Sequence, residues 1–215
     1  MLKIYVVSIF LLLSTVVKAT DTFTIDDKML VEIQKNYSKD AKEKIVNLIA
    51  LLNTIKDKDE SIQIKEINDY FNTLEYKSDA LVWKKKDYWA SRIEFLNREM
   101  GDCEDYVIAK YFSLIQLGIS KDRLFLTYVK AIKYKQAHMI LSYYKKKGAV
   151  PLVLDNIIKE ILPATKRKDL RPVFSFNGEK IYMAKLRGLG KEIPKGKVNL
   201  KKWTNLILKI KREHQ

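Results

Sequence analysis

The spacing of hydrophobic residues changes along the chain, from a helical pattern in the first half to a strand pattern in the second. Apolar residues recur every three or four positions over 41–55 and again over 64–74, with lysine, aspartate and asparagine between them. This spacing is typical of amphipathic helices. The charged break KDKDES separates the two segments. The pattern therefore predicts an antiparallel pair of helices.

The clearest helix begins at Asp102. The segment DCEDYVIAKYFSLIQLG has an N-cap residue, acidic residues in the first turn, apolar residues at helical spacing and Gly118 at its end. Each of these is a signal of a helix boundary or of a helix interior. The aromatic-rich stretch before it, residues 81–96, leads into a short helix that ends near Met100.

Beyond residue 122, apolar residues gather in short runs that predict strands. The runs over 123–132, 136–144 and 151–157 are rich in β-branched and aromatic residues and are separated by polar turns. Residues 173–184 contain an Asn-Gly pair between two apolar runs, which is typical of a hairpin. Helices followed by antiparallel strands predict an α+β fold, with a cysteine-bearing helix packed on the sheet.

A last amphipathic helix is predicted near the C-terminus. Lysines occupy one face, and the other face carries Leu200, Trp203, Leu206, Ile207 and Ile210. Such an apolar face either packs on the core of its own domain or docks on a partner, and core packing is the commoner outcome.

The first nineteen residues resemble a secretory signal peptide. Lys3 precedes an apolar run from Ile4 to Val17, and small residues follow at Val17 and Ala19. The run is shorter than the roughly 20 residues of a membrane-spanning helix. We expect a cleaved signal at 1–19 and export, with an uncleaved anchor as the alternative. The rest would form an N-terminal helical region (20–80), a core (81–190) and a C-terminal basic helix (191–215).

The net charge of +15 raises the question of an anionic partner. Lysine is spread over nearly every segment, whereas arginine, which is favoured for recognising phosphates and bases, is scarce. We interpret the charge as a lysine-rich surface and expect no nucleic acid as partner.

The chain has one cysteine, Cys103, in the first turn of the helix that begins at Asp102. In an oxidising compartment cysteines normally form pairs, so an unpaired one is either buried and inert or kept for its reactivity. The positive end of a helix dipole favours a thiolate. Of the two histidines, only His138 lies in a predicted element, because His214 is next to the C-terminus.

A thiol nucleophile needs a base and a group that orients the base. A tight loop over 145–148 would pair Tyr144 with Ala149, and in that register His138 lies opposite Asp155. Directly opposed residues lie on one face of a sheet, about 5 Å apart. The pattern predicts a triad of Cys103, His138 and Asp155. Taken singly, each also has a structural interpretation, as a packing cysteine, a half-buried histidine and a turn aspartate.

Three carboxylates surround the cysteine: Asp102, Glu104 and Asp105. Nearby carboxylates raise the pKa of a thiol, which a divalent cation would offset. Their oxygens suit Ca²⁺. The alternative is purely helical, with Asp102 as N-cap and the other two as partners of the helix dipole.

Three segments resemble the LapG-type periplasmic proteases, which are bacterial transglutaminase-like cysteine proteinases. They are DYWASRIEFLNREMGDCEDYVIAKYFSLIQLGI, YVKAIKYKQAHMILSYY and PLVLDNIIKEILPATKRKDLRPVFSFN, with GDCEDY, QAHM and PLVLDN in the family's order. The likeness runs from about Trp83 to Ala184. Nothing is carried over for the segments outside it.

The resemblance implies a papain-like, transglutaminase-type core with Cys103 as nucleophile, His138 as general base and acid, and Asp155 as orienting carboxylate. It implies calcium dependence, with Asp102 and Glu104 as the matching acidic positions and Asp105 as a further candidate. It also implies a periplasmic enzyme that cuts a large surface adhesin at a paired-alanine site and so releases bacteria from biofilms. An inner-membrane receptor for cyclic di-GMP would be its regulator.

Two alternatives remain. One keeps the fold and changes the substrate, as an exported amidase or acyltransferase that acts on cell-wall peptides. The other is a basic protein that binds lipid or polyanions without catalysis, with Cys103 inert.

Overall fold

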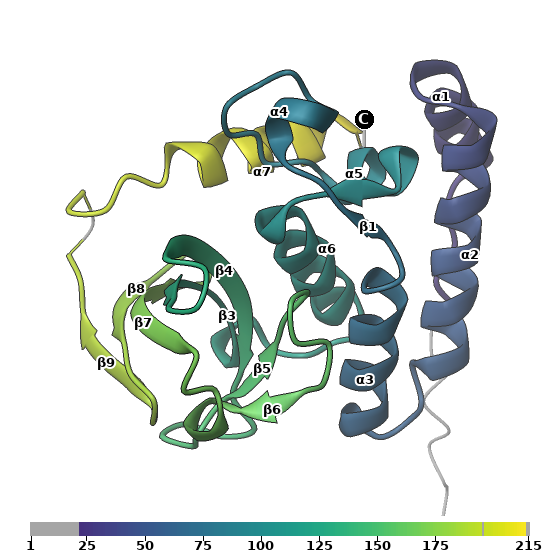
Figure 1. The fold of residues 1–215 in the computed structure, drawn as a ribbon. Helices are drawn as coiled ribbons and strands as arrows, with labels where there is room; N and C mark the ends of the chain where they lie inside the picture. Colours follow the sequence, from purple (N-terminus) through teal and green to yellow (C-terminus); the bar gives the residue numbers. More distant parts are fainter. Residues whose placement is uncertain (1–21, 195, 214–215) are drawn as a thin grey trace, which may run out of the picture.

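The protein folds into a curled antiparallel sheet with helices packed against one side of it (Figure 1). The computed structural model describes residues 22–194 and 196–213, so the predicted signal peptide and His214 lie outside the described residues. Seven strands follow the order β6-β5-β4-β3-β7-β8-β9. They are β3 (Leu124–Ala131), β4 (Gln136–Tyr143), β5 (Leu152–Leu154), β6 (Leu162–Pro163), β7 (Leu170–Phe176), β8 (Ile181–Ala184) and β9 (Leu189–Glu192). The α+β prediction is confirmed.

The helices come from both ends of the chain and from its middle. Two short 3-10 helices, η1 and η2, and a parallel pair of two-residue strands complete the fold. The bounds are α1 (Asp27–Asn36), α2 (Lys39–Ile55), α3 (Glu60–Phe71), β1 (Glu75–Tyr76), α4 (Asp79–Val82), α5 (Arg92–Arg98), β2 (Met100–Gly101), α6 (Cys103–Gln116), η1 (Lys121–Arg123), η2 (Ala164–Lys166) and α7 (Lys201–Glu213). Helix α1 was not predicted, and instead of forming a simple pair, α2 packs mainly on α5 and α1 while α3 packs on α6.

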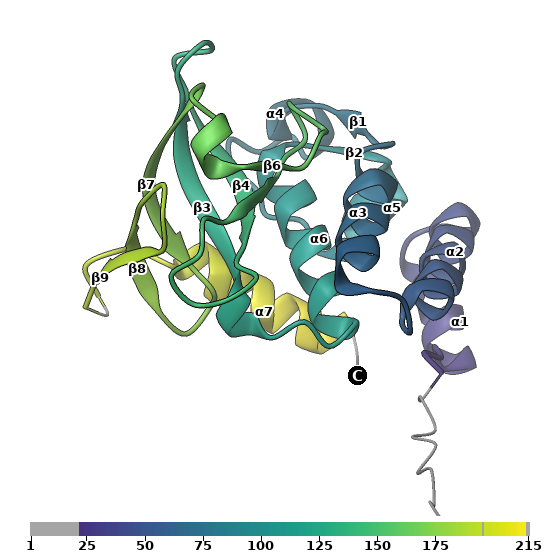
Figure 2. The same ribbon diagram turned by 90° about the horizontal axis from the view of Figure 1, so that it is seen from below.

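Helix α6 is the centre of the fold and lies between the sheet and α3 (Figure 2). Its N-terminus is closed by a capping box. The Asp102 carboxylate accepts from the backbone N–H of Glu104, and the Asp105 carboxylate accepts from the backbone N–H of Asp102. Side chains are buried on nearly every side of it. Helix α6 is therefore held by the sheet and by the other helices together, which gives its first residue a well-defined position.

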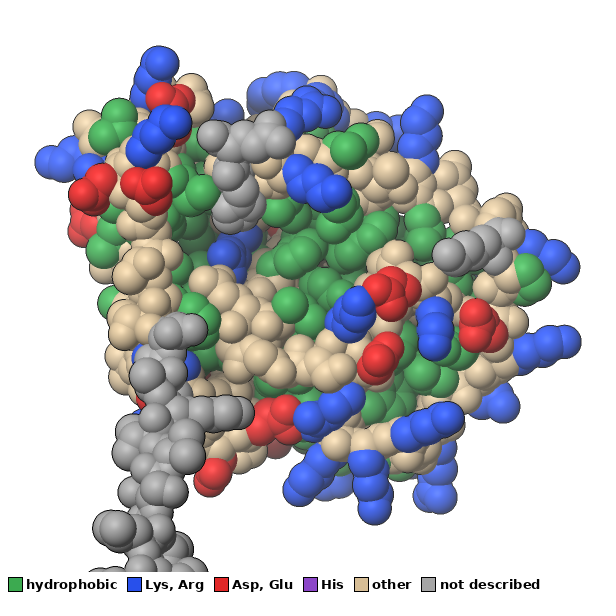
Figure 3. Space-filling view, turned by 180° about the vertical axis from the view of Figure 1, so that it is seen from behind, with side chains coloured by type: hydrophobic (Ala, Val, Ile, Leu, Met, Phe, Trp, Pro, Cys, Tyr) green, Lys and Arg blue, Asp and Glu red, His purple; other side chains and the backbone are tan. Residues whose placement is uncertain are grey.

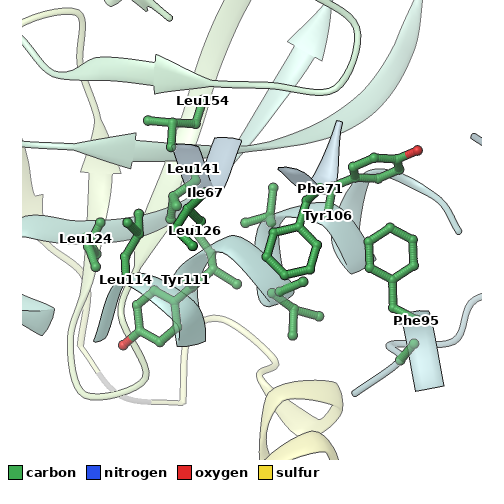
Figure 4. Close-up of a cluster of buried hydrophobic side chains, with 14 of the residues drawn as sticks. Ile67, Phe71, Phe95, Tyr106, Tyr111, Leu114, Leu124, Leu126, Leu141 and Leu154 are labelled. Atoms are coloured by element: carbon green, nitrogen blue, oxygen red, sulfur yellow. The ribbon is translucent and has the colours of Figure 1, made fainter. Parts of the chain in front are cut away.

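The main core forms on both sides of α6 (Figure 4). Phe71, Phe95 and Tyr106 fill the space toward the other helices, where the rings of Phe95 and Tyr106 meet edge to face with centroids 4.9 Å apart. On the sheet side, Leu114 packs with the inward leucines of β3, β4 and β5. The alternation of these leucines along the strands is the pattern expected of a sheet with one buried face.

Helix α7 packs on the core, as the commoner of the two interpretations predicted. Trp203 and Leu206 are buried. The indole of Trp203 stacks on Phe112 at 5.8 Å and meets Tyr111 and Phe176 edge to face, so it bridges α6 and β7. Among the described residues, no helix has the length and apolar composition needed to cross a membrane.

Charged side chains are dispersed over the surface. On the face seen in Figure 3, lysines and arginines lie mostly around the edge, with acidic side chains between them and apolar side chains gathered near the centre. This distribution agrees with a lysine-rich surface without a concentrated phosphate-binding patch on that face.

Candidate active site

Cys103 is the first residue of α6 and is almost fully buried. Its Sγ lies 2.7 Å from Oε2 of Glu104, a contact in which the thiol donates to the carboxylate. The backbone of Met139, the residue after His138, is close enough to the sulfur to lower the pKa of the thiol, against the larger effect of burial. The sulfur therefore lies between the start of α6 and the backbone of strand β4, and among the described residues no hydrogen bond joins it to His138.

His138 and Asp155 are in direct contact and both are buried. Nε2 of His138 lies 2.8 Å from Oδ1 of Asp155. An ionised carboxylate can only accept hydrogen bonds, so Nε2 carries the hydrogen and Nδ1 is the ring nitrogen able to accept a proton. The structure brings this predicted pair together, and it places Cys103 against the same strand.

The predicted strand register is wrong by two residues. It would pair Leu141 with Leu152, whereas the sheet pairs Leu141 with Leu154. The predicted tight loop does not form, because the carbonyl of Ala149 accepts from Gly188 and the N–H of Tyr144 donates to Arg123. A shift of two residues keeps both side chains on the same face. His138 and Asp155 consequently meet as diagonal rather than directly opposed neighbours.

Asp155 is held by donors on every side of its carboxylate. Oδ1 also accepts from the N–H groups of Asn156 and Ile157, at 2.7 and 3.1 Å. Oδ2 accepts from Nη2 of Arg167 at 2.7 Å. Burial alone would raise the pKa of Asp155, but the hydrogen bond and charge of His138 and the hydrogen bond from Arg167 lower it to about 2. Asp155 is therefore ionised at neutral pH.

Arg167 was not identified from the sequence. It is buried, and besides Asp155 it contacts both carboxylate oxygens of Asp169, through Nε at 2.9 Å and Nη2 at 2.7 Å. Asp169 is two residues away, which is a local pairing that the run KRKD could have suggested. The ion pair between Arg167 and Asp155 depends on tertiary contacts, so no local sequence pattern predicts it.

The carboxylates near Cys103 form a cluster that includes a fourth member, Asp79, which the sequence did not reveal. Ligand atoms of Asp79, Asp102 and Asp105 lie within 4.8 Å of one another, as do those of Asp102, Cys103 and Glu104. Asp79 comes from the first turn of α4, across the site from α6. Its position next to the cysteine helix is set only by the fold.

The cluster is electrostatically unfavourable as it stands. Burial and the neighbouring carboxylates raise the pKa of Asp102 to about 9 and that of Asp105 to about 8, and burial raises the pKa of Asp79. Burial, Glu104 and Asp102 together raise the pKa of the Cys103 thiol well above its usual range. Repulsion of this kind is relieved when a cation joins the carboxylates.

The donors fit a divalent cation with hard oxygen ligands. Oδ1 of Asp79 is buried and has no hydrogen-bond partner among the described residues, so it is available as a ligand. Asp105 is a weaker candidate ligand, because both of its carboxylate oxygens already accept hydrogen bonds. The donors are the N–H group of Ala90, at 2.8 Å, and the N–H group of Asp102. Asp79, Asp102 and Glu104 are the stronger candidates, with Asp105 as a buried neighbour.

Comparison with known proteins identifies the family. The model of the bacterial transglutaminase-like cysteine proteinases (BTLCP) matches residues 34–169, a range that contains Cys103, His138, Asp155 and Arg167. The chain belongs to this family. It is therefore a cysteine proteinase by family, with the transglutaminase-like fold that the sequence resemblance implied.

Solved structures of LapG from Legionella pneumophila are similar to this chain over most of its length. The calcium-bound LapG structure is 35% identical, with a TM-score of 0.73, and the match covers 86% of this chain and 99% of that one. A second LapG structure and an EGTA-treated one are each 36% identical, with TM-scores of 0.71 and 0.70 and coverage of 84% and 97%. The search of curated proteins found no match.

Proposed function

We propose that this chain is a calcium-dependent cysteine endopeptidase with Cys103 as nucleophile, His138 as general base and acid, and Asp155 as the group that orients the imidazole. The observation that carries the proposal is the buried 2.8 Å hydrogen bond between Nε2 of His138 and Oδ1 of Asp155, beside a cysteine at a helix start. These are the three parts that nucleophilic catalysis by a thiol requires.

The proposed reaction is acyl transfer in two steps. Nδ1 of His138 takes the proton of the Cys103 thiol as the sulfur attacks a peptide carbonyl carbon, and the imidazolium returns the proton to the leaving amine. Water then gives a proton to the same nitrogen and attacks the thioester, which releases the acid and restores the thiol. The backbone N–H of Cys103 at the helix start is our candidate donor to the oxyanion.

Asp155 supports both steps. Because it is ionised and fixed by donors from three segments of chain, it holds Nε2–H and stabilises the imidazolium that forms when His138 takes a proton. The base is thus organised before the substrate arrives.

We propose Asp79, Asp102 and Glu104 as the residues that would hold calcium, with Asp105 next to them. When bound, the cation supplies positive charge that neutralises these carboxylates, and so it favours the thiolate at Cys103. Similarity to a calcium-bound LapG supports the proposal. The unpartnered Oδ1 of Asp79 supports it independently.

A shallow groove of about 300 Å³ lies along β3, β4 and β7. Its lining combines the rings of Tyr128 and Phe174, which lie 4.6 Å apart, with Lys130, Lys135 and Ala137, the residue before His138. We propose that an extended substrate peptide lies in this groove.

We further propose that the substrate is the N-terminal region of a large surface adhesin, that the enzyme works in the periplasm, and that an inner-membrane cyclic di-GMP receptor sequesters it. The support is the likeness to LapG, together with the signal-like first nineteen residues. Cell fractionation tests the location, since recovery of the full-length chain in the cytoplasm would contradict it.

The deciding experiment is cleavage of an adhesin fragment that contains paired alanines. The wild-type chain should cut it in the presence of calcium, and Cys103→Ala should abolish cleavage while the melting temperature stays near that of the wild type. A fragment with the two alanines replaced by leucine is the matched control. Retained cleavage by Cys103→Ala would reject the mechanism, and cleavage of purified wall peptides instead of the fragment would favour the amidase alternative.

A further inference from the structure

We propose that Lys110, together with Asn72, is a positioning residue for catalysis: from the interior of α6 and the end of α3 these side chains hold the main chain of Asp155 in place. The inference rests on the proposed function, because it gives Asp155 the role of orienting His138.

The sheet alone does not fix Asp155 against His138. The ladder between β4 and β5 extends only from the pair Tyr143–Leu152 to the pair Leu141–Leu154. Asp155 follows the last residue of β5 that pairs with β4, and His138, which pairs with Val129 of β3, lies three residues beyond the last residue of β4 that pairs with β5. The hydrogen bond between the two side chains therefore spans a part of the structure where the backbone ladder has already ended.

Two buried side chains hold Asp155 instead. Its carbonyl oxygen accepts from Nδ2 of Asn72 at 2.9 Å and from Nζ of Lys110 at 3.2 Å. Nζ of Lys110 also donates to Oδ1 of Asn72 at 2.8 Å and to Oδ1 of Asn68 at 3.0 Å. The three hydrogens of the ammonium group are thus matched by three oxygen acceptors, and the backbone of Asp155 is one of them.

The same helix end also binds the loop that follows Asp155. Nδ2 of Asn68 donates to the carbonyl of Lys159 at 2.8 Å, and Nζ of Lys159 donates to the carbonyl of Asn72 at 2.8 Å. The segment from Asp155 to Lys159 is consequently tied to α3 at both of its ends. A shift of this loop would move Asp155 away from the imidazole.

Lys110 is a costly residue for simple packing. Its side chain is fully buried, and burial lowers its pKa to about 7 despite the nearby charge of Asp155. None of its three hydrogen-bond acceptors is a carboxylate. Methionine at this position would leave the buried oxygens of Asn68 and Asn72 without their donor, which costs stability. The test of a positioning role therefore needs a readout that a loss of stability alone would not change.

Helix α6 also links the two ends of the site. Cys103 and Lys110 are seven residues apart, which is within about 20° of two full helical turns and corresponds to a rise of about 10 Å. The sulfur and the ammonium group therefore lie on the same side of one rigid element. Through Lys110, α6 sets the position of Asp155 relative to the nucleophile that it carries.

The test compares Lys110→Met with Ser113→Ala, which removes another fully buried polar group of α6 that contacts Arg92 and not Asp155. For Lys110→Met we expect kcat to fall roughly 10- to 100-fold with KM within twofold, because small displacements of catalytic groups have effects of this size. Lys110→Gln, which keeps two N–H donors, should recover part of the loss. Ser113→Ala should leave kcat unchanged.

A spectroscopic measurement reads the position of His138 without any substrate. In a His214→Gln background, His138 is the only histidine, so its Nε2–H proton can be followed by NMR. In Lys110→Met and in Asn72→Ala this proton should shift and exchange faster with solvent, and it should stay unchanged in Ser113→Ala. An unchanged resonance in both Lys110→Met and Asn72→Ala would overturn the inference.

The outcomes separate this inference from the proposed function. If the wild-type chain cleaves nothing, the proposed function fails, and the NMR measurement still decides whether Lys110 positions the His138–Asp155 pair. If Lys110→Met does not fold, kcat and the His138 resonance in Asn72→Ala and Lys110→Gln test the positioning role instead. Wild-type kcat in these variants, or an equal loss in Ser113→Ala, would reject a positioning role.

Discussion

Arg167 and Asp155 form a buried ion pair in which Nη2 lies 2.7 Å from Oδ2, on the side of the carboxylate away from His138. The pair leaves Asp155 charged and unable to rotate without losing a charged hydrogen bond. Arg167 is thus as much a part of the site as the residues that the sequence suggested.

Arg167→Met should lower kcat by roughly 10- to 100-fold, because Asp155 loses the donor that fixes its second oxygen. Stability should fall by about 3 kcal/mol, because a buried carboxylate is left without its partner. Chemical denaturation and peptide cleavage measure the two effects. Arg171→Met is the matched control, since Arg171 is an exposed arginine on β7 and should affect neither quantity.

Asp155 should make stability depend on pH in the acid range. Its folded pKa of about 2 is below the unfolded value near 4, so its contribution of about 2 kcal/mol is fully present above pH 4 and is lost as the pH falls toward 2. Denaturant titrations between pH 2 and pH 6 should show this loss in the wild type. In Asp155→Asn the free energy of unfolding should not show this loss as the pH falls. The same dependence on pH in the variant and the wild type would contradict a lowered pKa for Asp155.

The same substitution should also impair catalysis. In Asp155→Asn the amide can present its NH₂ group to the ring, which favours the tautomer with its hydrogen on Nδ1 and removes the base. By analogy with other triads, kcat should fall by about 10³- to 10⁴-fold. Single-turnover cleavage measures this directly. Asp169→Asn, which changes a carboxylate on the far side of Arg167, should have a much smaller effect.

Calcium should raise the melting temperature if Asp79 and its neighbours bind it, because a ligand that binds only the folded state stabilises that state. Asp79→Asn keeps the shape of the side chain and should reduce the calcium-dependent shift, and a chelator should abolish both the shift and the cleavage. Calorimetry with added calcium chloride is the measurement. Asp122→Asn, at an exposed position in η1, is the control. Equal shifts in the wild type and Asp79→Asn would exclude Asp79 as a ligand.

Trp203→Ala should lower stability by about 3–5 kcal/mol, since it empties a space between Phe112, Tyr111 and Phe176. Leu208→Ala, on the exposed side of the same helix, should change stability little. Thermal unfolding distinguishes the two. Unchanged stability in Trp203→Ala would revive the interpretation that this face docks on a partner.

Several features of the site follow from local sequence alone. Asp102 and Asp105 close the start of α6 through contacts within four residues, so the position of Cys103 in the first turn could be predicted. The side-chain alternation of a strand has a period of two, so His138 and Asp155 could be placed on one face even though the predicted register was wrong by two. Composition and order of elements sufficed for the α+β class.

The tertiary structure alone decided the rest, because it depends on residues that are distant along the chain. Arg167 reaches Asp155, Asp79 approaches Asp102, and Lys110 meets the carbonyl of Asp155 only after the helices pack on the sheet. Local propensities carry no information on such contacts, since burial and hydrogen bonding across elements determine them. The sequence by itself predicted the candidate residues Cys103, His138 and Asp155, and long-range packing determined which charges and donors surround them.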